Sequence, residues 1–259
     1  MKNLLTIGIV LLVAGVSQAA PLKLTAVDPF GPGNGCPDVA GTLTTFDIKD
    51  AIMTVDTNTI NFVVDTNYGG SVNGDQFGGF TVSGVPITLY IGDVIFTISG
   101  VAKYGVALTA HQLASDTGAV TLGEVYRIDD PTVGGTAIAT AGQVIGLDPS
   151  HYEYYPNYPV WIHLGGGLTD MNTVAAITAT STGGNGSSAP EYQITVDFST
   201  LAWGGNPFLS GSAFGFSFAS ATCANDYIDG STTIPEPATM AMVGGALTLL
   251  SLLMRKRRT

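Results

Sequence analysis

The sequence has few charged residues, and most of these are acidic. Lys and Arg number nine against 20 Asp and Glu, so 259 residues carry a net charge of −11. Without a basic patch to neutralise phosphates, nucleic-acid binding is disfavoured. Gly is abundant, at 34 residues, whereas Lys, Arg and Glu are scarce. This composition is typical of strands and turns, not of helices.

Recognisable catalytic motifs are also missing. The chain has three His and two Cys, with no HExxH pair and no EF-hand spacing. The nearest match to a Gly-x-Ser-x-Gly nucleophile turn, at 215–219, falls inside an alternating strand pattern. We therefore predict a protein without catalytic residues or a required cofactor. A glycan hydrolase is the less favoured alternative, because two carboxylates that are distant in sequence can meet in the fold.

The N-terminus has the layout of a secretory signal peptide. One cation, Lys2, precedes an apolar run from 4 to 16, and small residues follow. Ser17 and Ala19 suit the −3 and −1 positions, which places the cut between Ala19 and Ala20. We expect export through the Sec translocon and removal of residues 1–19 by signal peptidase. A retained N-terminal anchor is the alternative.

The C-terminal segment, residues 233–259, combines three features in a fixed order. A triplet comes first: Pro235, Glu236 and Pro237. The next 17 residues, 238–254, are uncharged and would reach about 25 Å as a helix, at the short end of what crosses a bilayer. A basic tip follows: Arg255, Lys256, Arg257 and Arg258. Because cationic flanks stay cytoplasmic, we predict one transmembrane helix with the body outside.

This order of triplet, span and basic tip resembles the PEP-CTERM sorting signal. The resemblance implies that an exosortase in the inner membrane of a Gram-negative bacterium cuts near the triplet. The precursor would be anchored in that membrane, and the body would then pass to the cell surface or the extracellular matrix. The stretch before the triplet, with Cys223, Asn225 and Asp226, also resembles the end of a group of exosortase-dependent surface proteins, and residues 103–111 resemble the mid-domain strand of that group.

The exported body is more acidic than the whole chain suggests. Its remaining cations, against all 20 acids, are Lys23, Lys49, Lys103 and Arg127. Both cysteines, Cys36 and Cys223, also lie in the body, and in an oxidising compartment they are predicted to form a disulfide. Two free thiols, or one buried thiol, are the alternatives.

Period-two alternation predicts an all-β body. Apolar residues alternate at 60, 62 and 64, at 192–198, and at Phe214, Phe216 and Phe218. The cluster Asp-Thr-Asn at 56–58 predicts a hairpin turn between the strands at 45–55 and 59–65. Because strands with one apolar face must pack on a second sheet, we predict a two-sheet antiparallel sandwich at 42–232, of jelly-roll or lectin-like type.

Outside this sandwich we expect irregular structure at 20–41. A short helix is expected only at 136–147.

Two weaker patterns indicate ligands. The tyrosine-rich stretch 151–163 could stack on sugar rings, with Tyr154, Tyr155 and Trp161 as the residues. The alternative is a hydrophobic cap on the sandwich. Asp226 and Asp229 are the first choice for a structural Ca²⁺. Turn-forming side chains that cap their own backbone are the alternative.

The sequence thus predicts an exported surface or matrix protein, associated with exopolysaccharide or biofilm. A carbohydrate-binding module, calcium-dependent or not, is the second hypothesis.

Overall fold

The computed structural model describes eleven stretches of the chain, which together contain 15 strands. They are residues 21–27, 48–66, 77–82, 85–89, 91–112, 118–128, 138–140, 159–164, 168–181, 192–219 and 227–234. Within these stretches no helix is long and apolar enough to cross a membrane. The predicted signal peptide at 1–19 and the predicted span at 238–254 lie outside them.

One sheet has five antiparallel strands in the order β1-β2-β3-β13-β12. Its strands are β1 (Leu22–Val27), β2 (Ile48–Val55), β3 (Thr59–Thr66), β13 (Tyr192–Ser199) and β12 (Ala176–Ser181). The predicted hairpin is confirmed: the turn closes with the Asp56 amide donating to the Thr59 carbonyl at 2.9 Å. Predicted irregular structure at 20–41 is wrong at its start, because β1 pairs with β2 along its whole length.

The second sheet has six antiparallel strands in the order β11-β8-β7-β6-β14-β15. Its strands are β11 (Leu168–Val174), β8 (Glu124–Ile128), β7 (Val101–Val106), β6 (Val94–Ile98), β14 (Ala213–Ala219) and β15 (Tyr227–Thr233). The sequence pattern missed β15, because its first half resembles an acidic turn. The chain passes from this sheet to the five-stranded sheet at Ala175, between β11 and β12.

Two short antiparallel pairs lie beside the main sheets. They are β4 (Phe77–Val82) with β5 (Val85–Leu89), and β9 (Ile138–Thr140) with β10 (Pro159–Ile162). The helix predicted at 136–147 is therefore wrong over 138–140, where pairing with β10 holds the backbone extended. Two 3₁₀ turns, η1 (Leu201–Trp203) and η2 (Pro207–Leu209), connect β13 to β14.

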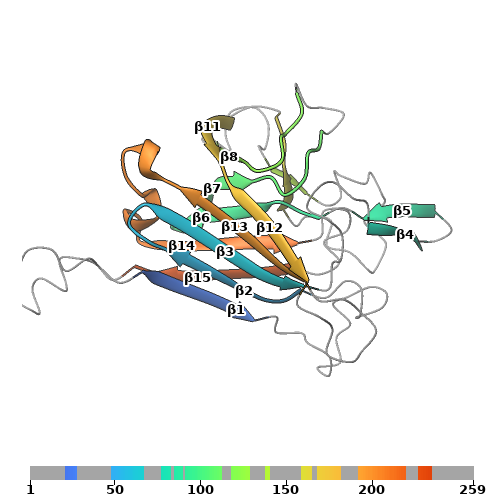
Figure 1. Ribbon diagram of the computed structural model, residues 1–259, viewed down its shortest axis with the longest axis horizontal. Helices are drawn as coiled ribbons and strands as arrows, with labels where there is room; N and C mark the ends of the chain where they lie inside the picture. The colour runs from blue at the N-terminus through green and yellow to red at the C-terminus, as the bar shows by residue number, and fades with distance from the viewer. Residues whose placement is uncertain are drawn as a thin grey trace, which may run out of the picture.

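The two large sheets pack face to face, as Figure 1 shows. Residues from both contribute to one core, in which Phe62 of β3 meets Phe216 of β14 edge-on with ring centroids 5.0 Å apart. The predicted alternation is confirmed here: Phe214, Phe216 and Phe218 are at most 2% exposed. An all-β fold of two packed antiparallel sheets is thus established for the described residues.

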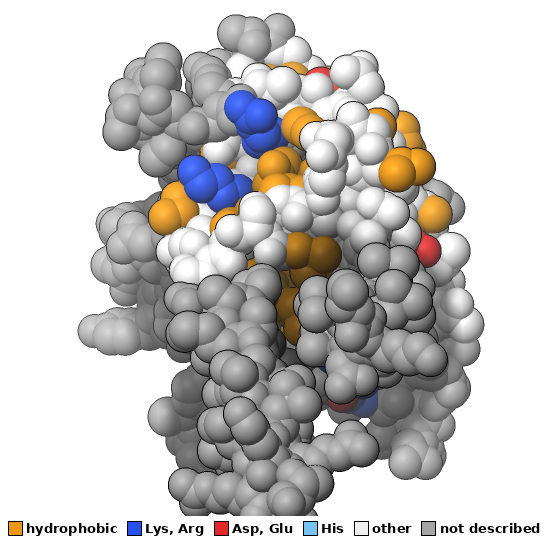
Figure 2. Space-filling view, turned by 90° about the vertical axis from the view of Figure 1, so that its left-hand side faces the viewer, with side chains coloured by type: hydrophobic (Ala, Val, Ile, Leu, Met, Phe, Trp, Pro, Cys, Tyr) orange, Lys and Arg blue, Asp and Glu red, His pale blue; other side chains and the backbone are white. Residues whose placement is uncertain are grey.

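The first and last strands lie side by side at one edge of the sandwich (Figure 1). A Cβ built on Gly230 of β15 would lie 3.2 Å from the Ala26 Cβ of β1, although the two strands belong to different sheets. The end of the sandwich that carries the 56–58 turn and both 3₁₀ turns faces the viewer in Figure 2. Because β15 runs toward this end, the chain leaves the described fold there.

Candidate functional site

Two buried titratable groups of the described residues, Asp93 and His111, meet next to the start of β6. Asp93 is fully buried and directly precedes β6. The preceding residue, Gly92, donates its amide to the Ala219 carbonyl at 3.0 Å, while the Asp93 amide donates to the Val160 carbonyl at 2.8 Å. A Cβ at position 92 would overlap the Ala219 oxygen, so only glycine allows this close approach.

Both carboxylate oxygens of Asp93 accept backbone hydrogen bonds. The Leu108 amide donates to Oδ1 at 3.1 Å, and the Ile162 amide donates to Oδ2 at 2.8 Å. His111 lies on the same side, with its Nε2 3.4 Å from Oδ2. One buried side chain therefore joins the segment after β7 to β10, although these partners are 15 and 69 residues away in sequence.

The imidazole of His111 is held on both nitrogens and on one face. Nδ1 lies 3.0 Å from the Thr109 carbonyl oxygen, and Nε2 lies 2.8 Å from the Ile162 carbonyl oxygen. Its ring stacks on that of Trp161, with centroids 4.3 Å apart and planes 16° apart. Trp161 in turn donates Nε1–H to the Ile91 carbonyl at 3.1 Å.

Burial dominates the electrostatics of this site. Loss of solvent raises the pKa of Asp93 from 3.8 to about 6, and His111 with the two backbone amides only partly offsets that rise. Each ring nitrogen of His111 thus faces a backbone carbonyl oxygen, and neither faces open space. With both nitrogens facing carbonyls, the ring has no open lone pair for a base or a metal. The Asp93–His111 cluster is therefore built as a structural tie.

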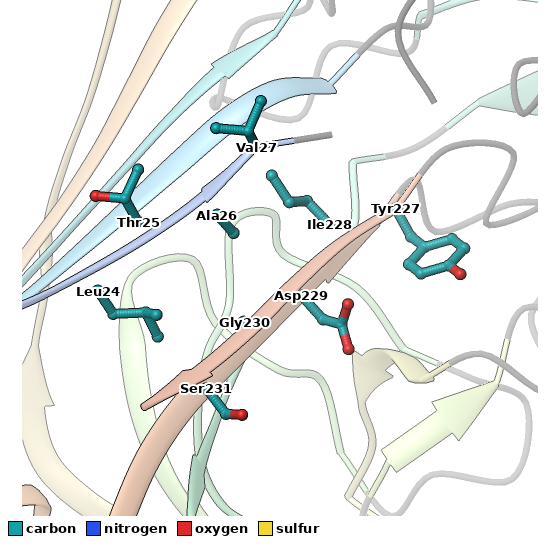
Figure 3. Close-up of a pocket in the computed structure, with 9 residues that line it drawn as sticks. All are labelled: Leu24, Thr25, Ala26, Val27, Tyr227, Ile228, Asp229, Gly230 and Ser231. Carbon is teal, nitrogen blue, oxygen red and sulfur yellow. The ribbon is translucent and has the colours of Figure 1, made fainter. Parts of the chain in front are cut away.

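A hollow with a volume of about 270 Å³ lies between β1 and β15. Figure 3 shows Ile228 pointing toward β1, whereas Tyr227 and Asp229 point to the other side of β15. Asp229 is exposed and sits within a strand, not in a loop. Its predicted calcium partner, Asp226, lies outside the described residues, and no group of three or more His, Cys, Asp or Glu gathers within them.

A carboxylate lies close to a second titratable group at two other places. Asp50 and Asp65 face each other across β2 and β3, where burial and the Asp65 charge raise the pKa of Asp50. Glu124 accepts a hydrogen bond from the Tyr126 hydroxyl, and burial raises the pKa of that phenol. Both pairs lie on sheet surfaces, and no cleft between them is part of the described structure. They therefore lend no support to the hydrolase alternative.

Of the three aromatic residues predicted to bind sugar, one lies within the described residues and two do not. Trp161 was predicted to present a flat face to sugars, but it is 6% exposed and stacked on His111. This prediction is wrong, because the ring serves as a wall of the buried cluster. Tyr154 and Tyr155 lie outside the described residues.

The other predicted sites also fall outside the described stretches. They are the cleavage pair Ala19 and Ala20, the cysteines Cys36 and Cys223, the triplet Pro235, Glu236 and Pro237, and the tip Arg255, Lys256, Arg257 and Arg258.

Sequence inspection missed Asp93 as a buried group. The available signal was weak: a single acid between Gly92 and the apolar run of β6. Comparison of the chain with models of protein families, with curated proteins and with solved structures gave no match. Any function must therefore be argued from the chain itself.

Proposed function

We propose that this chain is an exported, non-catalytic surface or extracellular-matrix protein of a Gram-negative bacterium. Its β-sandwich body would be delivered by signal peptidase and an exosortase. The order of features from Pro235 to Arg258 carries the proposal, because a triplet, an uncharged 17-residue run and a basic tip occur together at one end. The cationic tip would orient the span with the body outside.

The limits of the fold support this proposal. The first strand begins at Leu22, directly after the predicted cut between Ala19 and Ala20, and the last strand ends at Thr233, directly before Pro235. Removing both terminal segments would thus leave every described strand intact. A folded body that fills the interval between two processing sites is what a delivered protein requires.

The finer description also belongs to this proposal. A jelly-roll or lectin-like sandwich, closed by a disulfide between Cys36 and Cys223, suits an acidic protein in an oxidising compartment. The acidic surface would keep the protein soluble among matrix polymers such as exopolysaccharide.

Mass spectrometry of the protein recovered outside the cell tests the proposal. We expect a chain that begins at Ala20, ends near the Pro-Glu-Pro triplet and is about 2 Da lighter than its reduced form because of the disulfide. Recovery of chains that keep Leu250 and Arg258 would contradict exosortase processing. A Glu236→Ala variant provides a second test, since it should accumulate as the uncut, membrane-bound precursor.

The carbohydrate-binding alternative keeps one favourable observation, the hollow between β1 and β15. Glycan-array binding that is lost in Tyr227→Ala, at the rim of this hollow, but kept in Tyr192→Ala would support it. Binding that is lost only on changing Tyr154 or Tyr155 would place the sugar elsewhere.

A further inference from the structure

The residue from which the C-terminal tail departs is fixed at one end of the sandwich. Ile234 donates its amide to the Ser212 carbonyl at 2.9 Å, and the Ser212 hydroxyl lies 3.0 Å from that of Ser99. The side-chain amide of Asn206 donates a hydrogen bond to the backbone carbonyl of Asp56 at 2.6 Å. We call this end, formed by 56–58, 99–101, 201–212 and Ile234, the tether end.

Large hydrophobic side chains are exposed at the tether end. Leu201 of η1 is 69% exposed, Val101 of β7 is 44% exposed, and Leu209 of η2 is 37% exposed. Val101 pairs with Ile98, which pairs with Phe214, and Phe214 in turn pairs with Thr232. Val101 and Thr232 therefore lie in one row across the sheet. Figure 2 looks onto this end and shows hydrophobic side chains interspersed with uncharged ones.

Cations of the body are concentrated toward the same end. Lys23 pairs with Thr54 beside the 56–58 turn, and Lys103 follows Val101 by two residues. Arg127 pairs with Tyr104 on the neighbouring strand. Figure 2 shows Lys and Arg side chains beside the hydrophobic ones, and few acidic ones on the described part of this face. The remaining body cation, Lys49, lies at the far end of β2.

The chain length after Ile234 restricts where this end can lie. Only residues 235–237 separate Ile234 from the uncharged run that begins at Ala238. Even fully extended, this connection reaches at most about 14 Å. If the run spans the bilayer, the tether end must stay within that distance of the membrane surface.

We propose that the tether end docks on the outer face of the bilayer while the precursor is anchored. This inference rests on the proposed function, and specifically on the span at 238–254. Leu201, Leu209 and Val101 enter the headgroup region, and Lys23 and Lys103 face anionic lipid. The opposite end, with Val27 and the start of β15, points away from the membrane. Docking holds the triplet close to the membrane surface and fixes the face of the body that a membrane protease meets.

Lipid quenching of a tryptophan placed at either end of the sandwich tests this orientation. The full-length precursor would be reconstituted into vesicles of phosphatidylethanolamine and phosphatidylglycerol that contain brominated lipid. Leu201→Trp places a reporter at the tether end, and Val27→Trp places the same side chain at the opposite end, at a position that is 68% exposed. Circular dichroism and the melting temperature check that both variants fold.

After subtraction of the emission of the native Trp161 and Trp203, measured in the parent chain, brominated lipid should at least halve the emission that Leu201→Trp adds and leave unchanged the emission that Val27→Trp adds. Equal quenching of both reporters, or of neither, while the chain floats with vesicles would overturn the docking orientation alone. If the chain does not float with vesicles at all, the predicted transmembrane span at 238–254 is wrong. The proposed function then fails, and the docking inference that rests on it fails with it. If the emission of Leu201→Trp in detergent depends on protein concentration, a second copy of the chain covers the tether end, and this result would contradict docking on the bilayer.

Discussion

Nε2 of His111 lies 3.4 Å from Oδ2 of Asp93, and the same nitrogen lies 2.8 Å from the Ile162 carbonyl oxygen. The Ile162 amide also donates to Oδ2 of Asp93. The backbone N–H and C=O of one residue of β10, Ile162, are thus held by two side chains that come from other parts of the chain. This relationship makes the cluster a joint between β10 and the large sheet, and it can be tested by substitution.

Asp93→Ala should strongly destabilise the fold. The substitution leaves the amides of Leu108 and Ile162 without their acceptor and removes the carboxylate that faces His111. Breaking a buried pair of this kind typically costs about 3 to 5 kcal/mol. Urea unfolding measures the loss, and Asp197→Ala, at an exposed strand position, should change stability by less than about 0.5 kcal/mol. Similar losses for both variants would show that the cluster contributes no more to stability than an exposed strand position does.

The stability of the protein should depend on pH through Asp93. The pKa of Asp93 in the folded protein, about 6, is above the ordinary aspartate value of 3.8, so the folded state holds this proton more tightly than the unfolded chain does. The contribution is therefore fully present below about pH 4 and is lost as the pH rises through 6. A shift of this size corresponds to at most about 3 kcal/mol. Unfolding free energies measured from pH 4 to pH 7.5 should fall more steeply for the parent than for Asp93→Asn; parallel profiles would refute the assignment.

Gly92→Ala should also destabilise, for a steric reason. The added methyl overlaps the Ala219 carbonyl oxygen, and relieving that overlap breaks the hydrogen bond from the Gly92 amide. Overpacking of this kind costs about 1 to 3 kcal/mol. Gly118→Ala is the matched control, since its nearest neighbour would be a Leu164 methyl at 3.4 Å. Thermal melting of the two variants compares them, and an unchanged melting temperature for Gly92→Ala would disprove the close approach.

Asp50→Asn should stabilise the protein slightly at neutral pH. Burial and the facing Asp65 raise the pKa of Asp50, so its charge is unfavourable there. Because the pair lies near the surface and is screened, the gain should be only a few tenths of a kcal/mol. The gain should diminish as the pH falls through the raised pKa of Asp50, because that carboxyl then loses its charge. Denaturant unfolding at neutral and at acidic pH, with Asp197→Asn as the control, checks the sign.

The β2–β3 hairpin and the aromatic face of β14 could be predicted because their signals are local. Ile60, Phe62 and Val64 alternate with more exposed residues, and all three are fully buried. Ile48 is also fully buried, although it is out of phase with Met53. A bulge opposite Asp65 inserts one residue into β2 and restores the orientation. Alternation alone does not reveal such a bulge.

The edge strands and the buried cluster could not be predicted in this way. β1 was interpreted as irregular because Pro21 and a glycine-rich stretch flank it, and β15 because Asp229 and Gly230 interrupt its pattern. Pairing with β2 and β14 decides both. Trp161 looked like a binding aromatic because its neighbours in sequence are tyrosines, yet its contacts in space are His111 and Ile91.

The sequence by itself determined the strand-rich composition, the two-sided alternation of the core strands and the order of the segments at the two ends, because each of these is a property of neighbouring residues. The tertiary structure alone decided that Asp93 is buried, that it meets His111 and Ile162, and that β1 and β15 lie together. These depend on contacts between residues that are far apart along the chain, and no local pattern encodes which distant partners will supply the hydrogen bonds that a buried charge requires.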